Sequence, residues 1–283
     1  MKLGAITDEF SEDPAIAAPA MHAAGLETAE LRVLWGKNIL DLSDAELDKA
    51  LAILDENELS VDCIASPLLK CTLPGGFPTD ERFQRDVFAS RHTFEDQPRL
   101  SDRAFAVAQK CAAKMVRVFS YWRTADPDAV FERIVDALGE LAERASAQGL
   151  VIGLENEHAC NISTAREAAR VLAATDNPSL QIVWDPANAY VAGERPFPDG
   201  FQLLPVDRIA HVHAKDCRLI DGHAEWGLIG DGDIDWQGQL SALAAEGYGG
   251  HINLETHWAG PGGDKLEGSR LCASRLHRLV AAI

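Results

Sequence analysis

Four side chains with metal-binding chemistry follow short apolar runs in the second half of the chain. They are Glu155, Asp185, His213 and Glu255. They are spaced by 30, 28 and 42 residues, and each spacing is about the length of one strand and one helix. If the runs are neighbouring parallel strands, about 4.8 Å apart, these side chains can converge on one point. Three carboxylates gathered there would repel one another, and one divalent cation would relieve that repulsion. Oxygen-rich coordination with one imidazole suits Mn²⁺, which we prefer, and Mg²⁺, Co²⁺ or Zn²⁺ would also fit.

The imidazole ligand has two candidates, because His211 and His213 lie on the same side of one strand. His213 is nearer the carboxyl end of that strand, where the other three side chains gather. We therefore predict His213 as the ligand, with His211 in a supporting layer.

Eight short apolar runs alternate with longer amphipathic stretches. The predicted strands are 3–7, 28–33, 61–65, 115–120, 151–155, 180–184, 209–213 and 251–255. The predicted helices are 13–24, 42–58, 100–113, 126–148, 163–174, 236–246 and 264–282. Capping boxes are predicted at Ser43 with Glu46 and at Ser163 with Glu167. Such strands are typical of a parallel sheet buried on both faces, so we predict an α/β fold, a single (β/α)8 TIM barrel over residues 1–283.

A doubly wound sheet is the rival fold, but the first strand is followed by Thr7-Asp8-Glu9-Phe10 and not by a glycine-rich turn. Three connections, near 66–99, 188–205 and 218–235, are too long for plain turns. In a barrel they would follow strands on the catalytic face, where loops of this length usually have a function.

Composition excludes some classes of function. The formal net charge is −18, which argues against binding nucleic acid or anionic membranes. No run approaches the roughly 20 apolar residues of a membrane helix, and the N-terminus lacks the pattern of a signal peptide. The six cysteines show no C-x-x-C spacing, so we expect reduced thiols and a cytoplasmic location.

The motifs around the four ligand candidates read LEN, WDPAN, HVHAKD and LETH. With them the chain resembles the sugar phosphate isomerase/epimerase family of xylose isomerase-like TIM barrels over essentially its whole length. The resemblance implies that Glu155, Asp185, His213 and Glu255 hold the metal, which binds a carbonyl oxygen and a neighbouring hydroxyl of a sugar and stabilises an enediolate. It also implies that Glu155 and Glu255 remove and return the proton. A homodimer is the assembly that related barrels suggest.

Further residues near the predicted mouth could bind a carbohydrate substrate. They are His158, Asn188, Lys215, Arg123, Arg218, Trp122 and His257. We expect His158 and Asn188 to bind hydroxyls, Lys215 to bind a carbonyl or anionic oxygen, and Arg123 to bind an anionic group. The family's ketose 3-epimerases carry His where this chain has Asn188, and Arg where it has Leu219. The Lys215-Asp216 pair is more similar to the inosose and keto-acid branches.

The sequence therefore predicts a divalent-metal-dependent isomerase or epimerase of a sugar, keto-polyol or sugar acid. A lyase of the inosose dehydratase type is an alternative on the same metal site. A non-catalytic sugar-binding barrel is a second alternative, and an endonuclease IV-like phosphodiesterase is disfavoured by the net charge.

Overall fold

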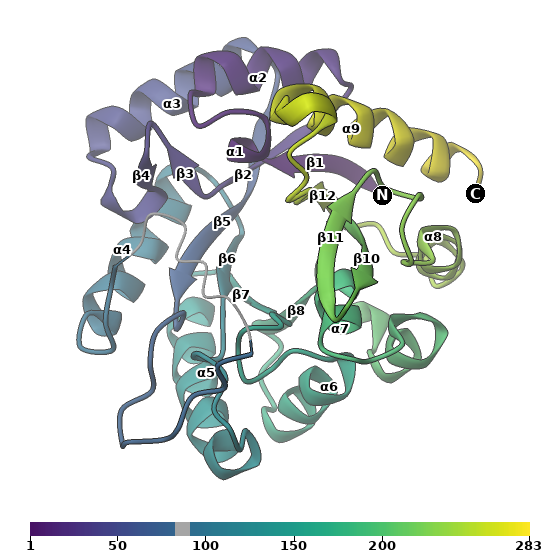
Figure 1. Ribbon diagram of the computed structural model, residues 1–283. Helices are drawn as coiled ribbons and strands as arrows, with labels where there is room; N and C mark the ends of the chain where they lie inside the picture. The colour runs from purple at the N-terminus through teal and green to yellow at the C-terminus, as the bar shows by residue number, and fades with distance from the viewer. Residues whose placement is uncertain (83–90) are drawn as a thin grey trace.

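Eight parallel strands close a barrel in the computed structural model, which describes residues 1–82 and 91–283. Their order round the barrel is β1-β12-β9-β8-β7-β6-β5-β2, and each neighbouring pair is parallel (Figure 1). The barrel strands are β1 (Lys2–Ile6), β2 (Thr28–Leu31), β5 (Ser60–Leu68), β6 (Met115–Val118), β7 (Val151–Glu155), β8 (Leu180–Trp184), β9 (Ile209–Ala214) and β12 (His251–Leu254). The predicted TIM barrel is confirmed.

Helices lie around the barrel and at its mouth, the longer ones as an outer ring (Figure 1). They are α1 (Thr7–Phe10), α2 (Pro14–Ala23), α3 (Asp44–Glu56), α4 (Gln97–Lys110), α5 (Phe131–Ser146), α6 (Ala165–Ala174), α7 (Pro186–Val191), α8 (Trp236–Ala245) and α9 (Lys265–Ala281). Among them, α1 and α7 follow β1 and β8 directly and were not predicted as helices. Both begin beside the mouth of the barrel, so they bring Asp8, Glu9 and Asn188 close to the site described below.

Local capping chemistry sets where two helices begin. Ser43 and Glu46 form the predicted capping box of α3. In α6 the box is formed by Thr164 and Glu167, so the prediction of Ser163 as the cap was wrong by one residue. The cap and its acidic partner must be three positions apart, and Thr164 satisfies that offset.

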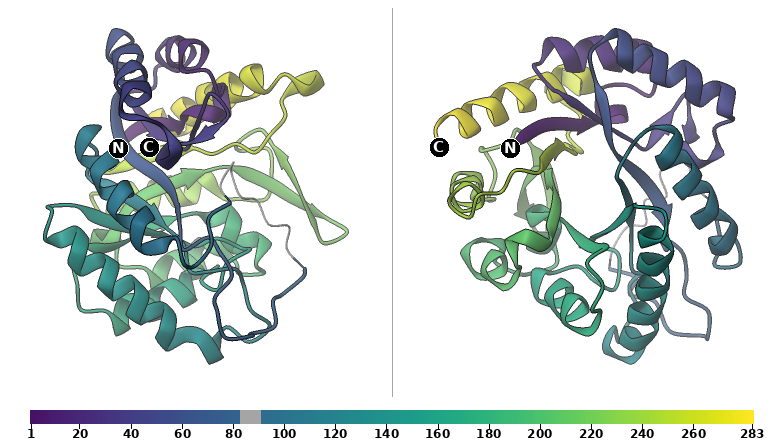
Figure 2. Two further views of the ribbon diagram at one scale, coloured as in Figure 1. Left: turned by 90° about the vertical axis from the view of Figure 1, so that its left-hand side faces the viewer. Right: turned by 180° about the vertical axis from the view of Figure 1, so that it is seen from behind.

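The predicted long connections contain structure of their own. Segment 218–235 holds an antiparallel hairpin of β10 (Asp216–Ile220) and β11 (His223–Gly227), which projects from the barrel in the left view of Figure 2. Segment 188–205 contains most of α7 and two further short helical segments, Pro196–Gly200 and Phe201–Leu203. Segment 66–99 includes the end of β5 and the start of α4, and its residues 83–90 lie outside the described part of the chain. A second hairpin joins β3 (Val33–Leu34) and β4 (Lys37–Asn38).

The interior of the barrel is unusually polar. Cys63, Met115 and Val183 form a small apolar cluster separate from the main hydrophobic core. Several barrel strands also carry fully buried polar side chains, among them Glu30, Arg117, His211 and Asn253. Branched apolar residues usually fill this space in TIM barrels, so the buried charges here call for a chemical explanation.

The described residues form no helix with both the length and the apolar character needed to cross a bilayer. All six cysteines are buried and free of disulfides, as expected for reduced thiols.

Candidate metal centre

The four predicted ligand residues meet at the mouth of the barrel. Ligand atoms of Glu155, Asp185, His213 and Glu255 all lie within 4.8 Å of one another, and all four side chains are buried. Glu155 is the last residue of β7, Asp185 follows β8, His213 lies near the end of β9 and Glu255 follows β12. Because β7, β8, β9 and β12 are consecutive neighbours in the barrel, their carboxyl ends bring these side chains together.

Asp185 is oriented by the helix that follows it. The backbone N–H of Asn188 donates to Asp185 Oδ1 at 2.8 Å, which makes Asp185 the N-cap of α7. The other oxygen, Oδ2, is buried and accepts no well-formed hydrogen bond from the described residues. One oxygen therefore caps the helix, and the second remains for the centre of the cluster.

His213 is oriented by Glu30, a residue of β2 that the sequence analysis missed. Nε2 of His213 lies 3.0 Å from Glu30 Oε2, whereas Nδ1 lies 3.3 Å from Glu155 Oε1 and 3.5 Å from Glu255 Oε2. His211 Nε2 lies 3.1 Å from the same Glu30 oxygen. Carboxylates commonly fix metal-binding imidazoles in this way. The ligand atoms of Glu30, His211 and His213 also lie within 4.8 Å of one another, so His213 as the ligand stays a prediction.

Lys215 lies against the cluster with its side chain almost fully buried. Its Nζ is 2.8 Å from Asp185 Oδ2 and 2.8 Å from Glu255 Oε2. Burial alone would lower the pKa of Lys215, but the charges of Asp185 and Glu255 raise that pKa well above its ordinary value. The lysine is thus a buried ammonium group beside two of the four ligand candidates.

Two buried arginines contact the outer oxygens of the two glutamates. Arg32 Nη1 donates to Glu255 Oε1 at 2.8 Å, and Arg117 Nη1 lies 3.1 Å from Glu155 Oε2. The sequence analysis missed both arginines, although a charged residue inside an otherwise apolar strand, as in 115–120, was a visible signal. Glu255 consequently receives hydrogen bonds on both oxygens, whereas Glu155 Oε2 accepts none of good geometry.

Arg32 also joins the cluster to two acids of α1. It donates to Asp8 and, at 2.7 Å, to Glu9 Oε1. Burial alone would raise the pKa of Glu9, but Arg32 and other nearby positive charges lower it to about 2. Glu9 Oε2 accepts hydrogen bonds from the Thr256 hydroxyl and the His257 backbone, so this network also holds the segment that follows Glu255.

The donor set fits one divalent cation. Asp185 Oδ2 is a buried carboxylate oxygen that lies 2.8 Å from Lys215 Nζ but accepts no hydrogen bond of good geometry from the described residues. Such atoms are costly to bury, and a cation would satisfy them. Three carboxylates and one imidazole form a donor set that Mn²⁺, Mg²⁺, Co²⁺ and Zn²⁺ all accept.

The predicted hydroxyl-binding pair lies together at the mouth. His158 Nδ1 is 2.8 Å from Asn188 Oδ1 and 3.0 Å from Glu157 Oε1. Burial alone would lower the pKa of His158, but the charge of Glu157 raises it above its ordinary value. Asn188 Nδ2 also donates to Glu155 Oε1 at 3.3 Å, which links this pair directly to the four-residue cluster.

Two other candidates lie close to charged groups of the site. His257 is about a quarter exposed, its Nε2 lies 3.7 Å from Glu255 Oε1, and its ring packs against Trp226 with centroids 5.2 Å apart. Trp122 is buried, and the ammonium of Lys70 lies 5.7 Å from the centre of its ring.

Arg123 and Arg218 are engaged by the protein itself. Arg123 donates to Ser163 Oγ and to Glu167 Oε1, each at 3.0 Å, and to backbone carbonyls after β7. Arg218 donates to the backbone carbonyl of Asp231 within the loop that follows the β10–β11 hairpin. These contacts tie loops together, and neither arginine contacts the four-residue cluster.

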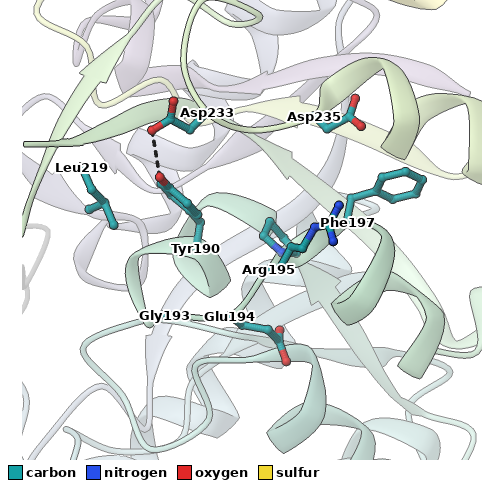
Figure 3. A pocket seen from close by; sticks show the side chains of 9 residues that line it. Tyr190, Gly193, Glu194, Arg195, Phe197, Leu219, Asp233 and Asp235 are labelled. Carbon is teal, nitrogen blue, oxygen red and sulfur yellow. Dashed lines mark hydrogen bonds between the residues drawn. The ribbon is translucent and has the colours of Figure 1, made fainter.

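A separate cavity of about 550 Å³ opens beside the mouth, between α7 and β10. Figure 3 shows the hydrogen bond across it, in which the Tyr190 hydroxyl donates to Asp233 Oδ2 at 2.8 Å. Its lining includes none of the four cluster residues.

Comparison with known proteins agrees with this architecture. The chain is 29% identical to inosose dehydratase of Bacillus licheniformis over a match covering 45% of this chain and 47% of that protein. It is 26% identical to 3-dehydroshikimate dehydratase of Pseudomonas putida over 55% of this chain and 25% of that protein. The matches thus span about half the length of the first relative, and less of the second.

A solved structure described as an IOLI protein with a bound zinc atom superimposes on this chain with a TM-score of 0.76. The superposition covers 100% of this chain and 99% of the other at 17% identity, which shows the shared fold. Residues 19–274 match the family described as xylose isomerase-like TIM barrel. The chain therefore belongs to the xylose isomerase-like TIM barrel family.

Proposed function

We propose that this protein is a divalent-metal-dependent enzyme that removes the proton next to the carbonyl of a polyhydroxylated ketone. The convergence of three carboxylates and one imidazole within 4.8 Å, at the end of the barrel where such enzymes react, carries the proposal. Glu155, Asp185, His213 and Glu255 would hold the ion. A bound divalent ion would act as a Lewis acid toward the ketone and its neighbouring hydroxyl.

The contacts of the two glutamates favour different roles for them. Glu155 Oε2 accepts no hydrogen bond of good geometry, although Arg117 Nη1 lies 3.1 Å away, so it is the glutamate oxygen that we assign to accept the substrate proton. Both oxygens of Glu255 accept hydrogen bonds, from Arg32 and Lys215, so this carboxylate is the weaker base and the more rigid ligand. We assign Glu155 as the general base.

The different contacts of Glu155 and Glu255 favour dehydration over isomerisation or epimerisation. Glu155 would take the proton from the carbon beside the carbonyl as the carbon–carbon double bond forms. The hydroxyl on the next carbon would leave as water with the proton that Glu155 took, giving an enone, and the Lys215 ammonium would stabilise the negative charge that develops on the leaving oxygen. Several curated relatives bear the name inosose dehydratase, which supports the same outcome.

Isomerisation or epimerisation is the second candidate, since both Glu155 and Glu255 belong to the cluster and could exchange one proton. Either reaction would require Glu255 to lose its hydrogen bond from Arg32 or Lys215 before Glu255 acts on the substrate.

Turnover of an inosose in D₂O tests the proposal and separates its two outcomes. The mass of the product should fall by one water for dehydration. An unchanged formula with deuterium on the carbon beside the carbonyl would indicate isomerisation or epimerisation. Full activity after exhaustive chelation would contradict both.

A further inference from the structure

The β10–β11 hairpin is anchored to the barrel at its base. The Asp216 carboxylate accepts hydrogen bonds from the backbone N–H groups of Cys217, Gly230, Gly232 and Ile234, at 2.9, 2.8, 3.3 and 3.2 Å. A Cβ atom on Gly232 would lie 2.2 Å from Asp216 Oδ1, so the chain returning from the hairpin packs closely against this carboxylate. The hairpin is therefore fixed at its base, although its far end projects from the barrel (Figure 2).

The register of the hairpin places Trp226 at this base. Trp226 pairs with Cys217, the second residue of β10, and its side chain is partly buried. Its ring packs against the ring of His257, with centroids 5.2 Å apart. The centre of the same ring system lies 5.3 Å from Nζ of Lys215. Because Lys215 follows β9 and His257 follows β12, one aromatic side chain bridges the segments after two neighbouring barrel strands.

The ammonium of Lys215 is buried, whereas the ring beside it is partly exposed. Lys215 is 1% exposed, and its Nζ lies 2.8 Å from Asp185 Oδ2 and 2.8 Å from Glu255 Oε2. A cation within about 6 Å of the centre of a tryptophan ring is attracted by the face of that ring. A buried ammonium next to a partly exposed ring indicates that the ring separates the ammonium from solvent on that side.

His257, the other neighbour of Trp226, is held in a strained backbone conformation. Its φ is 50°, in the left-handed region that residues with a Cβ rarely adopt. Its backbone N–H donates to Glu9 Oε2 at 3.2 Å, and its ring Nε2 lies 3.7 Å from Glu255 Oε1. Such strain persists only where surrounding contacts hold it, and it is concentrated at functional sites. Both neighbours of the Trp226 ring therefore belong to the charged network at the mouth.

We propose that Trp226 is a positioning residue for Lys215. Its ring holds the ammonium against Asp185 and Glu255 and keeps water away from it. The inference rests on the proposed function, in which Lys215 stabilises the leaving oxygen, and it adds a residue from outside the barrel to that role. Water at the ammonium would screen its charge, so the ring makes that charge more effective at the leaving oxygen.

Chemical labelling of Lys215 tests this cover without a substrate. Wild type and Trp226→Leu are treated briefly with acetic anhydride in the presence of Mn²⁺, and acetylation of Lys215 is quantified by mass spectrometry of the peptides. Acetylation should rise about tenfold in Trp226→Leu, because the buried ammonium loses its contact with the ring and opens to solvent more readily. Trp226→Phe keeps an aromatic face and should stay near the wild type. Equal acetylation of Lys215 in wild type and Trp226→Leu would overturn the inference.

Ile220→Ala is the matched control within the hairpin. Ile220 lies at the far end of β10, next to the turn, and is 46% exposed. Its replacement should leave acetylation of Lys215 unchanged, whereas a rise as large as that in Trp226→Leu would show that any disturbance of the hairpin exposes the lysine, against a specific role of the ring. Trp226→Met also lacks the ring and provides the same comparison if circular dichroism shows that Trp226→Leu does not fold.

Turnover of an inosose by the metal-loaded variants measures the consequence for the reaction. In Trp226→Leu kcat should fall about tenfold while KM changes by less than about twofold, because the ring acts on Lys215 and not on the substrate. Trp226→Phe should recover most of the lost kcat. An unchanged kcat would contradict the positioning role, and a raised KM with unchanged kcat would contradict it in favour of a direct contact with the substrate.

The labelling and turnover experiments separate this inference from the proposed function. If Trp226→Leu exposes Lys215 but the wild type removes no proton from any ketone, the proposed function is wrong and the cover over Lys215 stands. If the wild type is active and Trp226→Leu changes neither acetylation of Lys215 nor kcat, the proposed function stands and the inference about Trp226 is wrong.

Discussion

Oε2 of Glu30 lies 3.0 Å from Nε2 of His213, on the edge of the imidazole opposite the nitrogen that faces Glu155 and Glu255. Glu30 thereby fixes which nitrogen of His213 faces Glu155 and Glu255, although it is 183 residues away in the sequence. The contact requires β2 to close the barrel against β1. Because β1 pairs with β12 and Glu255 follows β12, closure of the barrel brings Glu30 to the site.

Replacing Glu30 should weaken metal binding. Glu30→Gln keeps the size of the side chain but loses the charge that orients His213, so the dissociation constant for Mn²⁺ should rise about 10- to 100-fold. Titration with the metal, followed by intrinsic tryptophan fluorescence, measures this. Glu27→Gln, an exposed neighbour, should bind metal as the wild type does. Equal affinities in both variants would remove Glu30 from the site.

Replacing Lys215 should lower catalytic activity without weakening metal binding. Lys215→Met removes the ammonium proposed to stabilise the leaving oxygen, so kcat should fall by a factor of about 100 or more. It also frees Asp185 and Glu255 from an ammonium at 2.8 Å, so metal affinity should hold or increase. Measuring kcat alongside metal affinity separates a catalytic lysine from a structural one, because a purely structural lysine would leave kcat of the metal-loaded protein near that of the wild type.

Metal binding should stabilise the fold. Removing the ion leaves Glu155, Asp185 and Glu255 close together and buried, whereas an ion at 100 times its dissociation constant adds about 2.7 kcal/mol to the free energy of unfolding. The melting temperature should therefore rise by several degrees on adding Mn²⁺, Co²⁺ or Zn²⁺ to chelator-treated protein. A melting temperature indifferent to all of these ions would argue against a metal at this cluster.

Arg32 should be important for stability because its guanidinium is the shared partner of Asp8, Glu9 and Glu255. Arg32→Met leaves these buried carboxylates uncompensated and should lower the free energy of unfolding by about 3–5 kcal/mol. Arg99→Met breaks an exposed pair with Asp96 and should cost less than about 1 kcal/mol. Urea unfolding at neutral pH compares the two, and similar losses would show that the buried network is not a major source of stability.

Stability should fall in acid through Glu9. Its pKa is about 2 in the folded protein and about 4.5 in the unfolded chain, so the folded state binds its proton less readily. The stabilisation is complete above about pH 4.5 and is lost as the pH falls toward 2, and it is on the order of 3 kcal/mol at neutral pH. Glu9→Gln should be less stable than the wild type at pH 7, and the difference should shrink between pH 4.5 and 3. A difference that stays constant over that range would rule Glu9 out as its source.

The apolar runs of the sequence predicted the barrel because buried parallel strands leave a strong, local signal. The strand ends of the second half likewise pointed to Glu155, Asp185, His213 and Glu255. Glu30, Arg32 and Arg117 were missed because their roles depend on closure of the sheet, which places the first strands against the last. A strand read by itself gives no indication that its charged residue faces a partner from a distant strand.

The β10–β11 hairpin was also missed, although its turn carried a visible signal. Asp221 and Gly222 both have positive φ, 51° and 80°, as a two-residue turn of type I′ requires. The Asp-Gly pair between alternating residues is a common hairpin signature, and here it was interpreted only as part of a long connection.

Asp185 has two structural roles, because Oδ1 caps α7 while Oδ2 faces the centre of the cluster. Asparagine there would keep a capping oxygen but lose the charge, and glutamate would keep the charge but displace it by one methylene. Few substitutions preserve both roles, so this position is tightly constrained in any descendant that keeps the proposed ion. Apart from Trp226, the hairpin and the outer loops have no such double role, so the protein can diverge there toward new substrates while the proposed reactive centre stays the same.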